Sequence, residues 1–153
     1  MSQAAMKPTA AVAPTDLGAN TMRTEIEDSA ETDAAIARLI FAAGEGHATA
    51  RLILGLRYLV GDGVPEDRQR AVHWFRMAAE QDDARAQYWL ARCYLTGRDT
   101  RHKNRRAYFW CRMAIANGHP DAGSLADGVG QHLTPAERRW TDAEVRAVLF
   151  RRR

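Results

Sequence analysis

The sequence predicts an all-α protein in which antiparallel helix pairs stack side by side as a solenoid. Of nine positions that begin at Ala50, seven carry the identical residue 36 positions further on. Within each copy, small and apolar residues recur at the i, i+4 spacing of a helix, and a glycine turn divides the copy into two helices. One such pair exposes an apolar face that it cannot bury alone, so neighbouring pairs must stack.

The repeated positions hold small residues and aromatic rings. In the first copy they are Ala50, Leu54, Gly55, Tyr58, Gly61, Ala71, Trp74, Ala78 and Ala79. In the second copy they are Ala86, Leu90, Ala91, Tyr94, Gly97, Ala107, Trp110, Ala114 and Ile115. Chance does not place two tyrosines and two tryptophans in the same register. Small residues let paired helices approach closely, and the rings fill the wider gaps between them.

Start and stop signals give the bounds of the helices. The first helix of the first copy ends at Gly61, where glycine favours a left-handed cap, and Asp67 is the expected N-cap of a second helix that runs to about Glu80. Near the C-terminus, Thr134 and Glu137 form a capping box with Pro135 at the first helical position. These signals predict a last helix over 134–150, after a shorter, glycine-interrupted helix over 121–132.

The chain ends differ from the repeated part. Residues 1–29 are rich in Ala, Pro, Thr and Ser and are expected to form a disordered leader. The repeat domain is expected over residues 30–153. It divides into a partial repeat with a leading helix (30–47), two full repeats (48–83 and 84–119) and C-terminal capping helices (120–153).

The first copy resembles a Sel-one-like repeat, which is a relative of the tetratricopeptide repeat. It carries nearly the full pattern, namely Leu54, Gly55, Tyr58, Gly61, Gly63, Val64, Asp67, Ala71, Trp74, Phe75, Ala78 and Ala79. The second copy departs from that pattern in its loop, where Asp99, Thr100 and Lys103 replace the expected Gly, Val and Asp. The resemblance implies a right-handed superhelix of antiparallel helix pairs. It also implies an adaptor or scaffold, most often bacterial, that binds another protein or a peptide.

Composition limits the class of protein further. Apolar residues make up 46% of the 153 residues, and no run of about 18 of them occurs that would span a membrane. The N-terminus shows no secretory apolar region, so we expect a cytoplasmic protein. Residues 1–47 hold three basic and seven acidic residues, whereas residues 48–153 hold 19 basic and 12 acidic ones. The repeat domain is therefore basic.

Positions that differ between the repeats are the candidates for partner binding. Leu52, Ile53 and Leu56 of the first copy correspond to Tyr88, Trp89 and Arg92 of the second. If their helix lines the concave face, this second set forms an aromatic and arginine cluster of the kind that dominates protein interfaces. The alternative is that both rings pack against an adjacent helix.

The loop of the second repeat is the other candidate, because it is strongly basic. It holds Arg101, Lys103, Arg105 and Arg106, and the chain ends in three further arginines. Such charge suits an acidic protein, an anionic membrane surface or nucleic acid, and its alternative role is simply to keep the loop solvated. Nucleic acid is disfavoured, since no nucleic-acid motif or stacking aromatic residue accompanies the charge. Self-association through an end of the short solenoid stays open.

The sequence offers little for catalysis. The five histidines lack zinc-ligand spacing, and no cofactor motif occurs. In the repeat register Cys93 corresponds to Arg57, which looks exposed, and Cys111 to the core position Phe75, so a disulfide between them is not expected. Some cysteine-rich relatives handle β-lactams, but no serine here has a lysine three residues on. We expect a non-catalytic interaction module.

Overall fold

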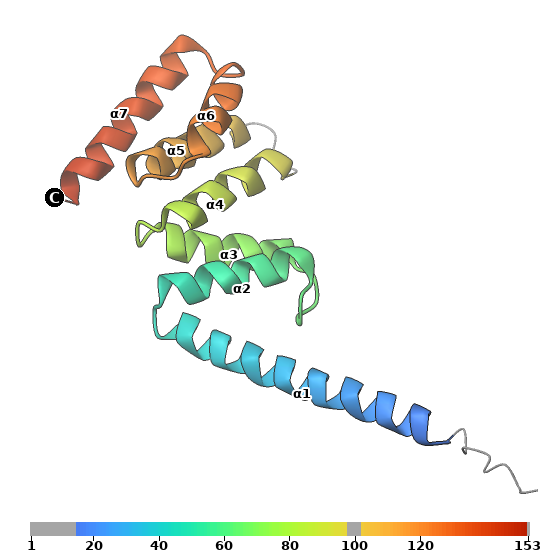
Figure 1. Ribbon diagram of the computed structural model, residues 1–153. Coiled ribbons are helices and arrows are strands. Elements are labelled where there is room, and N and C mark those ends of the chain that lie inside the picture. Colours follow the sequence, from blue (N-terminus) through green and yellow to red (C-terminus); the bar gives the residue numbers. More distant parts are fainter. Residues whose placement is uncertain (1–14, 98–101, 153) are drawn as a thin grey trace, which may run out of the picture. The chain divides into compact units, whose positions relative to one another are not determined.

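The computed structural model describes residues 15–97 and 102–152, with side chains described from residue 27 onward. These residues form seven α-helices and no strand, which confirms the predicted all-α class (Figure 1). The chain divides into two units, residues 1–35 and residues 36–153. The second unit contains all of the repeats.

Helix α1 runs from Thr15 to Gly44 and begins inside the leader that was expected to be disordered over 1–29. From residue 15 on, that leader is helical, and residues 1–14 lie outside the described residues. The reason is compositional. After Pro14 no proline occurs until Pro65, and the segment is rich in helix-favouring Ala, Glu and Arg. Residues 27–35 are all exposed, so helix propensity, and not core packing, accounts for this part of the helix.

The second unit is built from helix pairs that follow the repeats. Helices α2 (Ala48–Val60) and α3 (Arg68–Ala79) form the first pair, and α4 (Ala84–Thr96) and α5 (Lys103–Ala116) form the second. Helices α6 (Ala122–Gly130) and α7 (Pro135–Arg151) follow them. From α2 to α6 each helix packs on the next, and α5 also contacts α7 (Figure 1).

The core lies where the small residues of the repeats bring helices together. The repeated alanines at 71, 78, 86, 107 and 114 are all fully buried. Phe75, Leu54 and Leu90 are the largest apolar side chains with no exposed surface, alongside Met113. The 36-residue pattern therefore marks helix contacts, as expected from its composition.

The predicted caps of the first pair are confirmed. Gly61 ends α2 with a φ of 74°, and its N–H donates to the Arg57 carbonyl at 2.8 Å. This is the left-handed region that glycine enters without steric cost. The Asp67 carboxylate accepts from the Arg70 N–H at 3.0 Å at the start of α3. Gly97, one repeat later, has instead a φ of −73°.

A side-chain hydrogen bond, partly buried in the first repeat and buried in the second, recurs with the same period and ties consecutive repeats together. The Nε of Arg51 donates to the carbonyl of Ala43 at 2.9 Å, at the end of α1. One period later, the Nε2 of Gln87 donates to the carbonyl of Ala79 at 3.0 Å, at the end of α3. Helix ends leave carbonyls without an intrahelical partner, and each bond satisfies one of them from the next helix.

The C-terminal helix closes the stack on α5. Its start is the predicted capping box of Thr134 and Glu137, which is confirmed. Asp142 Oδ1 is buried without a hydrogen bond among the described groups, and its charge is met by Arg112 Nε at 3.0 Å. Trp140 remains 52% exposed, so it covers the last repeat only in part.

Candidate functional site

The three variant residues of α4 lie together. The Arg92 guanidinium stands 4.6 Å from the centre of the Trp89 ring and 5.8 Å from that of the Tyr88 ring. Arg92 is exposed, whereas both rings are half-buried. We call these three residues the aromatic cluster. A guanidinium over two rings is held there by cation–π attraction.

Both rings of the aromatic cluster also pack against other helices. Trp89 stacks on the buried Phe75 of α3 with centroids 6.3 Å apart. Tyr88 stacks on His119, between α5 and α6, at 4.3 Å. The two alternatives given by the sequence therefore coexist: the inner faces of the rings pack within the domain, and the remainder stays open to solvent beside Arg92.

The basic residues of the second loop divide between two places. Arg101 lies outside the described residues. Arg105 turns toward the C-terminal helix, with its guanidinium 4.2 Å from the centre of the Trp140 ring. Lys103 and Arg106 instead line a cleft between α3, the end of α4 and the start of α5. Of the chain-terminal arginines, Arg152 forms an ion pair with Asp82.

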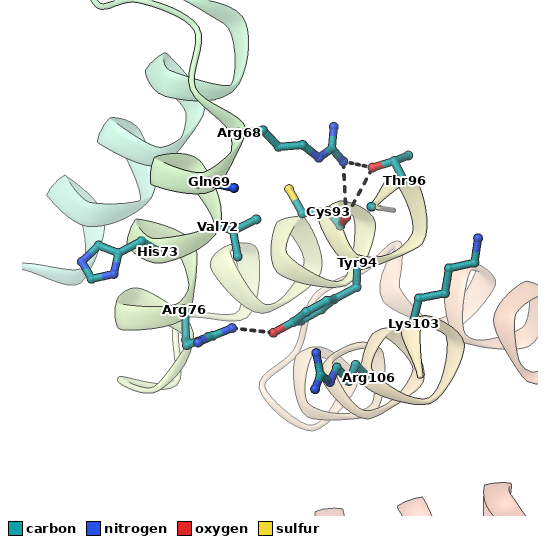
Figure 2. Close-up of a pocket in the computed structure, with 11 residues that line it drawn as sticks. Arg68, Gln69, Val72, His73, Arg76, Cys93, Tyr94, Thr96, Lys103 and Arg106 are labelled. Carbon is teal, nitrogen blue, oxygen red and sulfur yellow. Dashed lines mark hydrogen bonds between the residues drawn. The ribbon is translucent and has the colours of Figure 1, made fainter. Parts of the chain in front are cut away.

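This cleft, which we call the basic cleft, has a volume of about 690 Å³. Cations come from both walls, Arg68 and Arg76 from α3 and Lys103 and Arg106 from α5 (Figure 2). None of the described residues that line it is acidic. A recess with several cations and no described carboxylate attracts anionic groups.

Hydrogen bonds fix the geometry of the basic cleft. Arg76 donates to the Tyr94 hydroxyl at 2.9 Å, and the Arg106 guanidinium lies 5.8 Å from the centre of the same ring. Figure 2 shows the Tyr94 hydroxyl pointing at Arg76, with Arg106 beside the ring. Arg68 donates to the Cys93 carbonyl at 3.3 Å and to the Thr96 hydroxyl, which secures the far end of the cleft.

The α3 wall of the basic cleft was not predicted from the sequence. Arg68, Val72 and Arg76 follow one another at i, i+4 spacing and so share one stripe of the helix. That spacing was a usable signal. The stripe belongs to α3, in the first repeat, whereas the basic loop belongs to the second. The sequence alone does not show that the two lie side by side.

Comparisons with known proteins agree with this architecture. A family model described as Sel1 repeat matches residues 48–83 and again residues 84–119. The chain contains two Sel1 repeats. The predicted resemblance is thereby confirmed. Sel1 repeats are generally protein–protein interaction modules, and proteins built from them are typically non-catalytic.

Two solved structures are similar to this chain. One is a protective antigen of uropathogenic Escherichia coli with an SLR fold, at 28% identity over 72% of this chain and 24% of that chain, with a TM-score of 0.66. The other is a Sel1 repeat protein from Oxalobacter formigenes, at 32% identity over 61% of this chain and 39% of that chain, with a TM-score of 0.58. This chain thus spans about a quarter and two fifths of their lengths. No match is found among curated proteins.

The two cysteines of the second Sel1 repeat are free and buried. Cys93 is only 4% exposed, so the expectation that it is exposed, drawn from its register with Arg57, is wrong. The reason is that Cys93 belongs to the core cluster that α4 shares with α3, and Arg68 of α3 donates to its carbonyl. Burial raises the pKa of the Cys111 thiol to about 12 and also raises the pKa of Cys93. A neutral buried thiol is a poor nucleophile.

We expect stability to fall at alkaline pH because of Cys111. Its pKa is about 12 in the folded state against 9.0 for an unperturbed thiol, so between these values only the unfolded chain loses the proton. The free energy of unfolding should drop by about 1.4 kcal/mol from this group between pH 7 and pH 10. Urea unfolding at both pH values measures it. In Cys111→Ala this contribution to the loss of stability between the two pH values should be absent. A loss as large as that of the wild type would contradict the assignment to Cys111.

Two further observations concern other kinds of site. Within the described residues, no three His, Cys, Asp or Glu side chains lie close enough to hold a metal ion. In residues 15–97 and 102–152, no helix combines the length and apolar character that crossing a bilayer requires.

Proposed function

We propose that these Sel1 repeats form a non-catalytic module that binds another protein at the aromatic cluster of α4. The observation that carries the proposal is the aromatic cluster, in which Arg92 stands over the rings of both Tyr88 and Trp89. Tryptophan, tyrosine and arginine are the residues most enriched among those that dominate binding energy at protein interfaces. The first repeat has Leu52, Ile53 and Leu56 at these positions, so the cluster is specific to the second.

The packing of the rings supports this role. Trp89 is held by Phe75 and Tyr88 by His119, so neither ring has to be ordered when a partner arrives. Immobilising a rotamer-rich side chain costs about 0.5–1.5 kcal/mol on binding, and pre-ordered rings avoid much of that cost. The exposed Arg92 supplies donors for a carbonyl or carboxylate of the partner.

The partner can be captured by photocrosslinking in cells that make the protein. Benzoylphenylalanine replaces Arg92 in one variant and Arg146, which is exposed on α7, in the control variant. We expect a crosslinked protein, identified by mass spectrometry, that forms from position 92 and is absent from position 146. Crosslinks of equal yield from both positions would contradict a partner surface on α4.

We expect Arg92→Ala to weaken binding of the captured protein about fivefold to thirtyfold, which corresponds to about 1–2 kcal/mol. The truncation removes the cation that covers both rings while leaving their packing on Phe75 and His119 intact. Isothermal titration calorimetry with the purified partner measures the change. Arg146→Ala should bind like the wild type, and an unchanged affinity of Arg92→Ala would place the interface elsewhere on the repeats.

A further inference from the structure

The basic cleft has walls of like charge. Arg76 of α3 and Arg106 of α5 both approach Tyr94, one at its hydroxyl and the other at its ring. Lys103 lies on the same wall as Arg106. Within the described residues no carboxylate forms an ion pair with Arg76 or Lys103, since their neighbours in the cleft are neutral or basic. Arg76 and Lys103 therefore present positive charge to the cleft, and that charge attracts an anionic ligand.

The contact between α5 and α7 shows how an acidic side chain can pair with an arginine at the equivalent position of the second repeat. Arg112 occupies the position of Arg76 one period later. It meets the carboxylate of Asp142, which α7 brings to 3.0 Å from its Nε. Helix α7 packs on α5, and this ion pair joins the two helices. Arg76 has the Tyr94 hydroxyl where Arg112 has a carboxylate. The chain itself thus shows a polypeptide segment with an acidic side chain seated on this face of a repeat.

The floor of the cleft distinguishes between anionic ligands. Its lining includes Val72 and Tyr94, whose apolar surface suits the carbon atoms of a polypeptide. One face of the Tyr94 ring is approached by Arg106 and its hydroxyl is bound by Arg76, so the only Phe, Tyr or Trp ring of the described lining is already engaged by cations, which disfavours a nucleobase stacking there. A volume of about 690 Å³ holds a few side chains and suits neither a duplex nor a membrane surface.

We propose that the basic cleft binds an acidic segment of the partner polypeptide, with its carboxylates between Arg76 of α3 and Lys103 of α5. This inference rests on the proposed function, because it adds a second contact region to the same protein partner. The aromatic cluster and the basic cleft use different residues of α4, so the two regions are separable by mutation. Arg68, at the far end of the cleft, extends the row of cations for a second carboxylate.

The test measures binding of a fluorescein-labelled peptide of eight residues that alternates glutamate and leucine. Fluorescence anisotropy is recorded with the full chain at low salt. The glutamine–leucine analogue should bind at least tenfold more weakly, because it keeps the apolar contacts and loses the charge. The double variant Arg76→Gln, Lys103→Gln should also bind about tenfold more weakly than the wild type. The matched control Arg139→Gln, Arg146→Gln, with the same change in net charge on exposed positions of α7, should bind like the wild type.

Several results would overturn the proposal. An equal loss in both double variants would show attraction to the overall positive charge, and tighter binding of an eight-nucleotide RNA at the same residues would assign the cleft to nucleic acid. Failure of the glutamate peptide to bind the wild type, together with retained crosslinks from position 92, would reject the acidic segment alone. Loss of the position-92 crosslinks would reject the proposed function as well.

Discussion

Replacing Gly55 by alanine is expected to lower the free energy of unfolding by about 2–3 kcal/mol. A Cβ atom at this position of α2 would lie 2.6 Å from Cε1 and 2.7 Å from Cδ1 of Phe75. The ring has no exposed surface and stacks against Trp89, so it has little room to move away. Urea unfolding of the wild type and the variant, followed by circular dichroism, measures the difference.

The matched control for Gly55→Ala is Gly128→Ala in α6. Gly128 is exposed, and a Cβ there would meet nothing within 4 Å. Because alanine favours a helix over glycine, this variant should be more stable than the wild type by about 0.5–1 kcal/mol. A Gly55→Ala variant that also gains stability would contradict the close contact with Phe75.

The second repeat shows how the same contact changes when both residues change. There Ala91 stands in the register of Gly55 and Cys111 in the register of Phe75, and both are fully buried. A smaller residue on the second helix leaves room for a methyl group on the first. The substitutions therefore compensate each other in volume, which is what close packing of interiors requires.

Local signals in the sequence predicted most of the fold. Gly61, Asp67 and the pair of Thr134 and Glu137 each act through their own backbone neighbours, so their caps followed from spacing alone. The leader was the main error. Its alanines and prolines suggested disorder over 1–29, whereas the prolines end at residue 14 and helix propensity prevails from residue 15.

The candidate sites were harder to predict because they join residues from different repeats. Tyr88, Trp89 and Arg92 are close in sequence, and their departure from the repeat pattern identified them as a set. The α3 wall of the basic cleft comes from the previous repeat, and Arg105, adjacent to Arg106, faces Trp140 instead of the cleft. Neighbouring residues on a helix point in directions about 100° apart, so a basic run in sequence need not form one basic surface.

The buried Gln87 supports the second large prediction. It has no exposed surface, donates to the Ala79 carbonyl at 3.0 Å and accepts from Asn117 Nδ2 at 3.0 Å. One side chain of α4 thereby joins the end of α3 to the end of α5. The role of Gln87 was not predicted from the sequence, because in the first repeat the same position is Arg51.

Gln87→Leu is expected to lower the free energy of unfolding by about 2 kcal/mol, since each of two hydrogen bonds contributes about 1 kcal/mol. Urea unfolding measures the loss. The matched variant is Arg51→Leu, whose hydrogen bonds to the Ala43 and Met77 carbonyls are only partly buried, so water can replace them at less cost. The Gln87 variant should therefore be the less stable of the two. If Arg51→Leu were the less stable variant, the side-chain hydrogen bond at the end of α1 would contribute more to stability than the one at the end of α3. The hydrogen bond that recurs every 36 residues would then matter most at the N-terminal end of the repeats.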